Sequence, residues 1–162
     1  MTLQENIERI KEMIGLIVES YLNGIKDNDI VAATLIGEAG GEDEKGMIAV
    51  CNTIYNRATK KGTSMAGESL RPYQFSMWNN IISNVTTKKD YNVNLIIKLI
   101  NEKKLHPKWN QALNIVENPK NDITKGATHY YAFKGANRIK PPSFTNNWKQ
   151  TTVIGNHKFG IV

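Results

Sequence analysis

Glu38 is the acid whose surroundings in the sequence best suit proton transfer. It follows a strongly apolar segment, residues 30–36, and stands two residues before the pair Gly40-Gly41. Apolar surroundings disfavour a charged carboxylate and raise its pKa, and paired glycines let the backbone approach a ligand closely. A carboxyl group with a raised pKa is the general acid that glycoside cleavage needs near neutral pH. Glu38 is therefore the candidate catalytic residue, and a solvated glutamate at a helix end is the alternative.

The other ionisable residues suggest less chemistry. Glu42 comes four residues after Glu38, but the two glycines separate the acids, and Glu42 with the next two acids suits the first turn of a helix. The three histidines lack the spacing of metal ligands, so we expect no metal and no cofactor. No G-x-S-x-G motif for a serine nucleophile is present.

The apolar pattern predicts the elements that position these residues. Helices are expected over residues 3–21, 30–36, 42–58, 93–100 and 107–116, with Cys51 on a buried stripe. Residues 60–80 lack periodicity and predict a long loop with an aromatic cluster at 72–78. From residue 127 the period becomes two, which predicts a strand over 127–133, with His129 and Tyr131 on one side and Thr128 and Tyr130 on the other. A hairpin over 151–161, turned at Gly155-Asn156, completes an α+β fold, mostly helical with a small C-terminal antiparallel sheet.

Two segments are expected along the chain, an N-terminal amphipathic helix with its connector at 1–28 and a catalytic domain at 29–162. The first carries a heptad-like stripe that serves either docking on the domain or self-association and attachment to a partner. Its members are Leu3, Ile7, Ile10, Ile14, Ile17 and Tyr21. The N-terminus has no basic region followed by an apolar stretch, so the sequence predicts no secretory signal peptide.

Composition and charge limit the function classes. A chain of 162 residues with 40% hydrophobic and 22% charged residues is typical of one globular domain, which excludes collagen, disorder and membrane spans. A single cysteine excludes a disulfide scaffold. The net charge is +6, and the segment from Pro119 onward contains seven basic residues and one acidic residue. This basic C-terminal third indicates a polyanionic partner, which is a nucleic acid, an anionic membrane or an anionic bacterial wall; solvating lysines are the alternative.

Four ordered motifs carry a family resemblance over roughly residues 29–161. They are Ala33 to Glu42 with the following Gly46 to Val50 and Asn56-Arg57, then Tyr73 to Trp78, then Gly126 to Tyr131, and Ile154 to Phe159. Together they resemble the SleB/CwlJ-type cell wall hydrolases, the spore-cortex-lytic family. The resemblance implies a lysozyme-like domain that acts on peptidoglycan, with Glu38 as the catalytic residue and Glu42 in a supporting role. The family is similar to lytic transglycosylases, which cleave between N-acetylmuramic acid and N-acetylglucosamine.

One well-placed carboxylate suits a lytic transglycosylase, because the C6 hydroxyl of the muramic acid replaces a second acid as nucleophile. Polar side chains in the motifs are expected to hold the sugar substituents and aromatic ones to stack on the rings. The polar set is Gln74, Ser76, Thr128 and His129, and the aromatic set is Phe75, Tyr130 and Tyr131.

Other functions stay open at this point. A muramidase or glucosaminidase that hydrolyses the same class of bond, a non-catalytic wall-binding protein and a basic nucleic-acid-binding module are the alternatives. A wall-degrading enzyme without an export signal suits a phage lysin, released from the host cytoplasm at lysis or carried by a virion through the N-terminal helix, more than a spore enzyme. Peptidoglycan is the expected partner, with anionic wall polymers besides, and nucleic acid is disfavoured.

Overall fold

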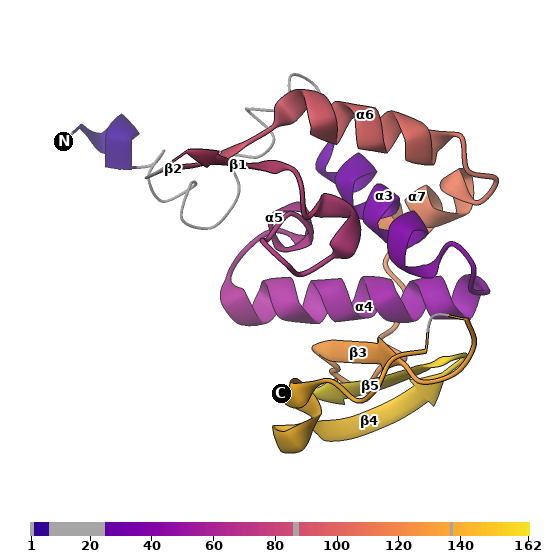
Figure 1. Ribbon diagram of the computed structural model, residues 1–162. Helices are drawn as coiled ribbons and strands as arrows, with labels where there is room; N and C mark the ends of the chain where they lie inside the picture. Colours follow the sequence, from indigo (N-terminus) through magenta and orange to yellow (C-terminus); the bar gives the residue numbers. More distant parts are fainter. Residues whose placement is uncertain (1, 7–24, 86–87, 137) are drawn as a thin grey trace.

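The computed structural model describes residues 2–6, 25–85, 88–136 and 138–162. A helical body stands above a small three-stranded sheet (Figure 1). Residues 3–6 are helical, and the other members of the predicted N-terminal stripe lie outside the described residues. Within the described part of the chain, no helix is both long and apolar enough to cross a membrane.

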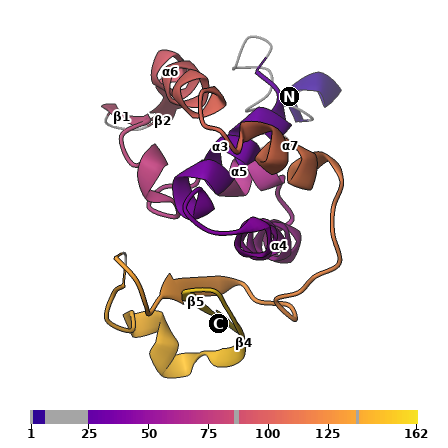
Figure 2. The ribbon, with the colours of Figure 1, turned by 90° about the vertical axis from the view of Figure 1, so that its right-hand side faces the viewer.

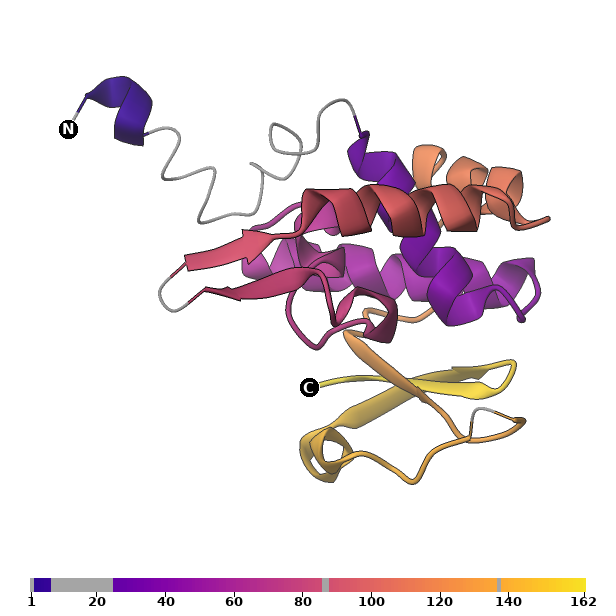
Figure 3. The ribbon, with the colours of Figure 1, turned by 45° about the horizontal axis from the view of Figure 1, so that its top comes forward.

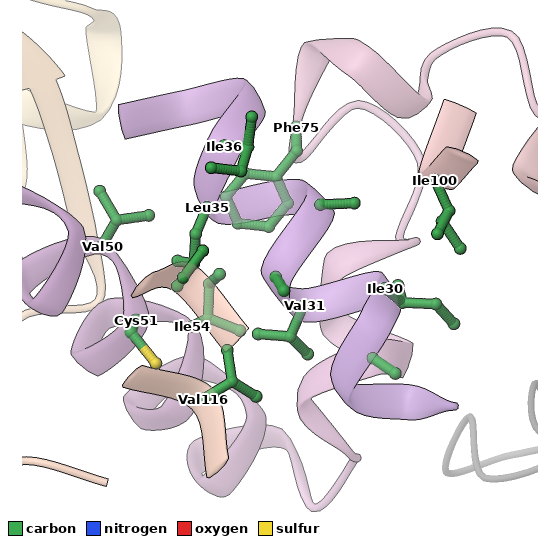
Figure 4. Packing of buried hydrophobic residues seen from close by; sticks show 14 of the residues in the cluster. Ile30, Val31, Leu35, Ile36, Val50, Cys51, Ile54, Phe75, Ile100 and Val116 are labelled. Carbon is green, nitrogen blue, oxygen red and sulfur yellow. The ribbon is translucent and has the colours of Figure 1, made fainter. Parts of the chain in front are cut away.

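Helix α3, Asp27–Ala39, is the centre of the helical body. Its side chains from Ile30 to Ile36 are at most 5% exposed, because helices contact it from several sides. Figure 4 shows residues of the cluster around it, with labelled side chains from α4, α6, α7 and the loop at Phe75. The predicted helix that is apolar on nearly all faces is therefore confirmed as the buried one. It ends before Gly40, as expected from the paired glycines.

The other helices surround α3. They are α4 (Glu44–Lys61), the short α5 (Met65–Ser69), α6 (Val93–Lys104) and α7 (Trp109–Glu117). Helix α4 begins where the Asp43 side chain accepts from the backbone N–H of Gly46, and it ends at Gly62 in the left-handed conformation. Cys51 lies on its buried face, as predicted.

Residues 60–80 are more structured than the sequence indicates. The predicted loop contains α5 and a 3-10 turn, η1 (Ser76–Trp78). After it comes a hairpin, β1 (Ile82–Val85) and β2 (Lys88–Tyr91), for which the sequence pattern gave no expectation. Figure 3 shows this hairpin projecting from the helical body at the start of α6.

The C-terminal sheet has the antiparallel order β3-β5-β4. Its strands are β3 (His129–Ala132), β4 (Lys149–Ile154) and β5 (His157–Ile161), and a second 3-10 turn, η2 (Ser143–Asn147), precedes β4. The hairpin turns at Gly155-Asn156, which confirms the prediction. The sheet lies under α4, and the connection from α7 to β3 passes beside that helix (Figure 2).

Two asparagines one turn apart on α4 fasten this connection. Asn52 Oδ1 accepts from the backbone N–H of Ile123 at 3.1 Å. Asn56 Nδ2 donates to Asp122 Oδ2 and to the carbonyl oxygen of Ala127, both at 3.0 Å. The start of β3 is thereby fixed against α4, which sets where the side chains of that strand reach.

Candidate active site

Glu38 lies in the last turn of α3 and is held by two elements distant in sequence. Its Oε2 accepts a hydrogen bond of 2.9 Å from the Tyr130 hydroxyl on β3. The backbone N–H of Ser76, at the start of η1, also donates to its carboxylate. The carboxyl is therefore fixed where the helical body, the loop and the sheet meet.

Burial raises the pKa of Glu38, although the hydrogen bonds from Tyr130 and Ser76 and the charge of Arg57 act in the opposite direction. The direction of this shift is the one that the sequence predicts for Glu38. Tyr130 is affected in turn, because burial and the neighbouring carboxylate raise its pKa well above the usual value. It therefore stays a neutral hydroxyl that donates to Glu38.

The turn η1 is docked along one face of α3. Trp78 Nε1 donates to the Thr34 hydroxyl at 2.9 Å, and Thr34 lies one helical turn before Glu38. Between these contacts, Met77 covers Gly37 so closely that a Cβ on that glycine would lie 2.5 Å from Met77 Sδ. A glycine before Glu38 thus lets the loop approach and present the Ser76 N–H.

An ion-pair network around the buried Glu68 supports this loop. Glu68 of α5 is fully buried, and its carboxylate lies 2.8 Å from Arg57 Nε, 3.2 Å from Lys61 Nζ and 3.5 Å from Arg71 Nη1. The Arg57 guanidinium lies 5.4 Å from the centre of the Phe75 ring. Because Phe75 immediately precedes Ser76, the network anchors the backbone that contacts Glu38.

Glu42 is not a second free carboxylate beside Glu38. Its Oε1 lies 3.7 Å from His157 Nδ1 on β5, and a Cβ on Gly155 would lie 2.9 Å from its Oε2. Lys108 donates to its backbone carbonyl oxygen. Burial lowers the pKa of His157, and the charge of Glu42 partly offsets this. Glu42 therefore joins the turn after α3 to the β4–β5 hairpin.

His157 lies on the same face of the sheet as Tyr130. Its ring meets the Tyr130 ring edge-on, with centres 5.5 Å apart. Tyr130, His157 and Phe159 all face the helical body, and Phe159 packs under Ala49 of α4. The Glu42–His157 contact thus lies beside the residue that holds Glu38.

The expected alternation along β3 is observed, and it separates the predicted site residues. Tyr130 faces the helices and reaches Glu38, whereas His129 and Tyr131 face away. The His129 ring lies 5.0 Å from that of Phe144, and the Tyr131 ring lies 5.6 Å from that of Trp148. These residues build an aromatic cluster on the outer face of the sheet.

Of the remaining predicted residues, Ser76 contacts Glu38 through its backbone N–H. Phe75 is 2% exposed and Tyr131 is 6% exposed, so neither ring has a free face for a sugar. Gln74 is exposed, and its side chain donates to the carbonyl oxygen of Pro72. Thr128 is buried, with its hydroxyl 3.0 Å from His129 Nδ1. Among the described residues, no cluster of histidine, cysteine and acidic side chains could hold a metal ion.

Sequence reasoning assigned no role to Arg57, to His157 or to the exposed Tyr73. All three had a signal in the sequence. Arg57 and His157 belong to the recognised motifs, and Pro72 marks a turn at Tyr73. The pairing of Arg57 with Glu68 crosses between helices and leaves no pattern in the sequence.

Comparisons with known proteins identify the family. The sequence model of a family described as Cell Wall Hydrolase matches residues 41–160, a range that begins three residues after Glu38. No curated protein sequence matches the chain.

Two solved structures are similar in fold. The first is the catalytic domain of the germination-specific lytic transglycosylase SleB from Bacillus anthracis, with 22% identity and a TM-score of 0.54, covering 85% of this chain and 98% of that one. The second is the catalytic domain of the Bacillus cereus SleB protein, with 22% identity and a TM-score of 0.49, covering 85% of this chain and 93% of that one. The first match confirms the predicted lysozyme-like α+β fold.

Proposed function

The chain belongs to the cell wall hydrolase family and is an enzyme of the cell wall; from this we propose that it cleaves peptidoglycan glycan strands between N-acetylmuramic acid and N-acetylglucosamine. The observation that carries the proposal is the burial and hydrogen bonding of the Glu38 carboxyl group. Burial raises its pKa, and Tyr130 and Ser76 hold its carboxyl in place. A carboxyl group with a raised pKa and a fixed position suits a general acid for a glycosidic oxygen.

In the proposed reaction Glu38 acts twice. Its proton passes to the glycosidic oxygen as the bond from that oxygen to C1 of the muramic acid breaks. The resulting carboxylate then takes the proton of the C6 hydroxyl, whose oxygen bonds to C1 and closes a 1,6-anhydro ring. Because the nucleophile belongs to the substrate, no second carboxylate and no water are needed, and Glu38 ends protonated as it began.

The surroundings of Glu38 support a mechanism with one acid. Apart from burial, the groups that shift its pKa are Tyr130 and Ser76, which donate hydrogen bonds to the carboxylate, and Arg57, which is positively charged. Tyr130 donates to Oε2, so Oε1 is the oxygen expected to carry the transferred proton. Glu42 is paired with His157, which supports a structural role in holding the sheet rather than activation of water.

The basic C-terminal third supports attraction to an anionic wall. Its exposed cations are Lys120, Lys125, Lys134, Arg138, Lys140 and Lys149. Attraction of this kind weakens as salt screens the charges, with a Debye length of about 8 Å at physiological ionic strength. Release as a phage lysin and virion attachment through the N-terminal stripe stay predictions from the sequence.

The experiment is digestion of purified peptidoglycan followed by mass spectrometry of the products. Anhydro ends support transglycosylation, and reducing ends indicate a hydrolase with water as nucleophile. Glu38→Gln is expected to abolish lysis while the protein stays folded, and Glu44→Gln, an exposed acid in the first turn of α4, is the matched control. Lysis by Glu38→Gln at the wild-type rate would contradict the proposal.

A further inference from the structure

Tyr73 is an aromatic residue that is not packed in the core of the fold. It is 86% exposed, and among the described tyrosines the next most exposed is Tyr55 at 56%. Phe75 and Tyr131, which the sequence suggested as sugar-stacking residues, are buried. Tyr73 is thus the residue of the 72–78 aromatic cluster that offers a free ring to a ligand.

The backbone at Tyr73 is one that tyrosine rarely adopts. The N–H of Gln74 donates to the carbonyl oxygen of Arg71 at 3.2 Å, which closes a turn with Pro72 second and Tyr73 third. Tyr73 has a φ of +60°. A proline followed by a positive φ defines a type II turn, whose third position favours glycine or asparagine. A bulky residue held there is strained, and strain of this kind gathers at functional sites.

The turn is tied to the catalytic glutamate by the residues that follow it. Phe75, two residues on, is anchored in the core, and Ser76 donates its backbone N–H to Glu38. Three residues of chain span at most about 10 Å, so the backbone of Tyr73 stays that near to that of Ser76. The exposed ring is therefore carried on the same short, anchored loop that contacts the acid.

We propose that the Tyr73 ring is a stacking platform for one sugar ring of the glycan strand, next to the bond that Glu38 cleaves. An exposed tyrosine offers a rigid, amphipathic face with few rotatable bonds, which suits the apolar face of a pyranose ring. The strained turn presents the ring to solvent instead of letting it pack on the protein. This subsite rests on the proposed function, because its ligand is the glycan strand.

Tyr73→Asn tests the subsite, because asparagine suits the turn and removes the ring. We expect Tyr73→Asn to keep or raise the thermal midpoint of unfolding. We expect it to lower the rate of lysis at low peptidoglycan concentration by about three- to tenfold, the range for one lost aromatic contact. The loss should shrink as peptidoglycan approaches saturation. Tyr73→Phe and Tyr73→Trp keep the ring and should stay near the wild-type rate.

Binding without turnover separates this subsite from the chemistry. In the Glu38→Gln background, adding Tyr73→Asn should weaken co-sedimentation with purified peptidoglycan, whereas adding Tyr55→Ala should not. Wild-type lysis and binding by Tyr73→Asn, with Glu38→Gln inactive, would overturn the subsite and leave the proposed function standing. Equal losses in Tyr73→Phe and Tyr73→Asn would also overturn it, since the hydroxyl and not the ring would then matter. An active Glu38→Gln would instead count against the proposed function.

Discussion

The hydroxyl of Tyr130 donates a 2.9 Å hydrogen bond to the carboxylate of Glu38, across 92 positions of the chain. This contact joins the end of the most buried helix to the first strand of the sheet. Its geometry depends on Asn52 and Asn56, which hold the chain before β3 against α4. The candidate acid is thus positioned by the whole fold rather than by its local sequence.

Tyr130→Phe is expected to slow wall lysis by about ten- to hundredfold, the effect of losing one hydrogen bond to a charged group. The bond favours the carboxylate, so its loss should raise the pKa of Glu38 further. Activity that needs protonated Glu38 would then persist to higher pH. The measurement is the rate of lysis against pH, with Tyr55→Phe as the control. If the pH at which the rate of lysis falls on the alkaline side is unchanged or lower in Tyr130→Phe, this role is contradicted.

His157 and Glu42 give a second pH-dependent prediction. Burial lowers the pKa of His157, so the stability gained from its neutral form is present above the usual histidine pKa and is lost as the pH falls through the lowered one. Glu42 opposes this shift, and Glu42→Gln should therefore lower the pKa of His157 further.

Nuclear magnetic resonance titration of the histidine rings measures the pKa of His157 in the wild type and in Glu42→Gln. His129 is the internal control, because burial and nearby cations lower its pKa without a contribution from Glu42. An unchanged His157 titration in Glu42→Gln would show that the two side chains do not interact in solution.

The sequence predicted those parts of the molecule whose pattern is local. The continuous apolar run of α3, the stripe of α4 and the alternation of the C-terminal strands each bury residues at a regular spacing, and each is found. The alternation also predicts correctly that His129 and Tyr131 lie on the opposite face of β3 from Tyr130. It does not say which face meets the helices, because both faces of β3 carry aromatic residues, and the choice depends on contacts with α4 and with Phe144 and Trp148.

The parts that were missed depend on long-range contacts. Helix α5 has five residues, too few to display a period, and its buried Glu68 is stable only because Arg57, Lys61 and Arg71 surround it. The role of the Ser76 side chain as a ligand of the sugar stays a prediction, and sequence reasoning missed the hydrogen bond from its backbone N–H to Glu38. Backbone donors of this kind carry no signature in residue type.

Glu68→Gln is expected to destabilise the protein by about 3–5 kcal/mol, because it leaves the buried Arg57 charge without its partner. Glutamine keeps the volume, so the loss would report charge and not packing. Urea denaturation measures it, with the exposed Glu117→Gln as the control. A stability change below about 1 kcal/mol, the level of a surface ion pair, would show that the network is not desolvated.

Gly160 gives a test of how the outer face of the sheet is covered. A Cβ at this position would lie 2.4 Å from Trp148 Cε3 and 2.7 Å from the carbonyl oxygen of Lys149. The oxygen belongs to the neighbouring strand and cannot rotate away, so Gly160→Ala should cost about 1–3 kcal/mol as the indole and the strand shift. Thermal unfolding monitored by circular dichroism measures the stability of each variant. Gly41→Ala is the matched control, because a Cβ there meets nothing within 4 Å and the backbone is not in the left-handed region. Equal stability of the two variants would mean that Trp148 does not rest on the sheet at Gly160.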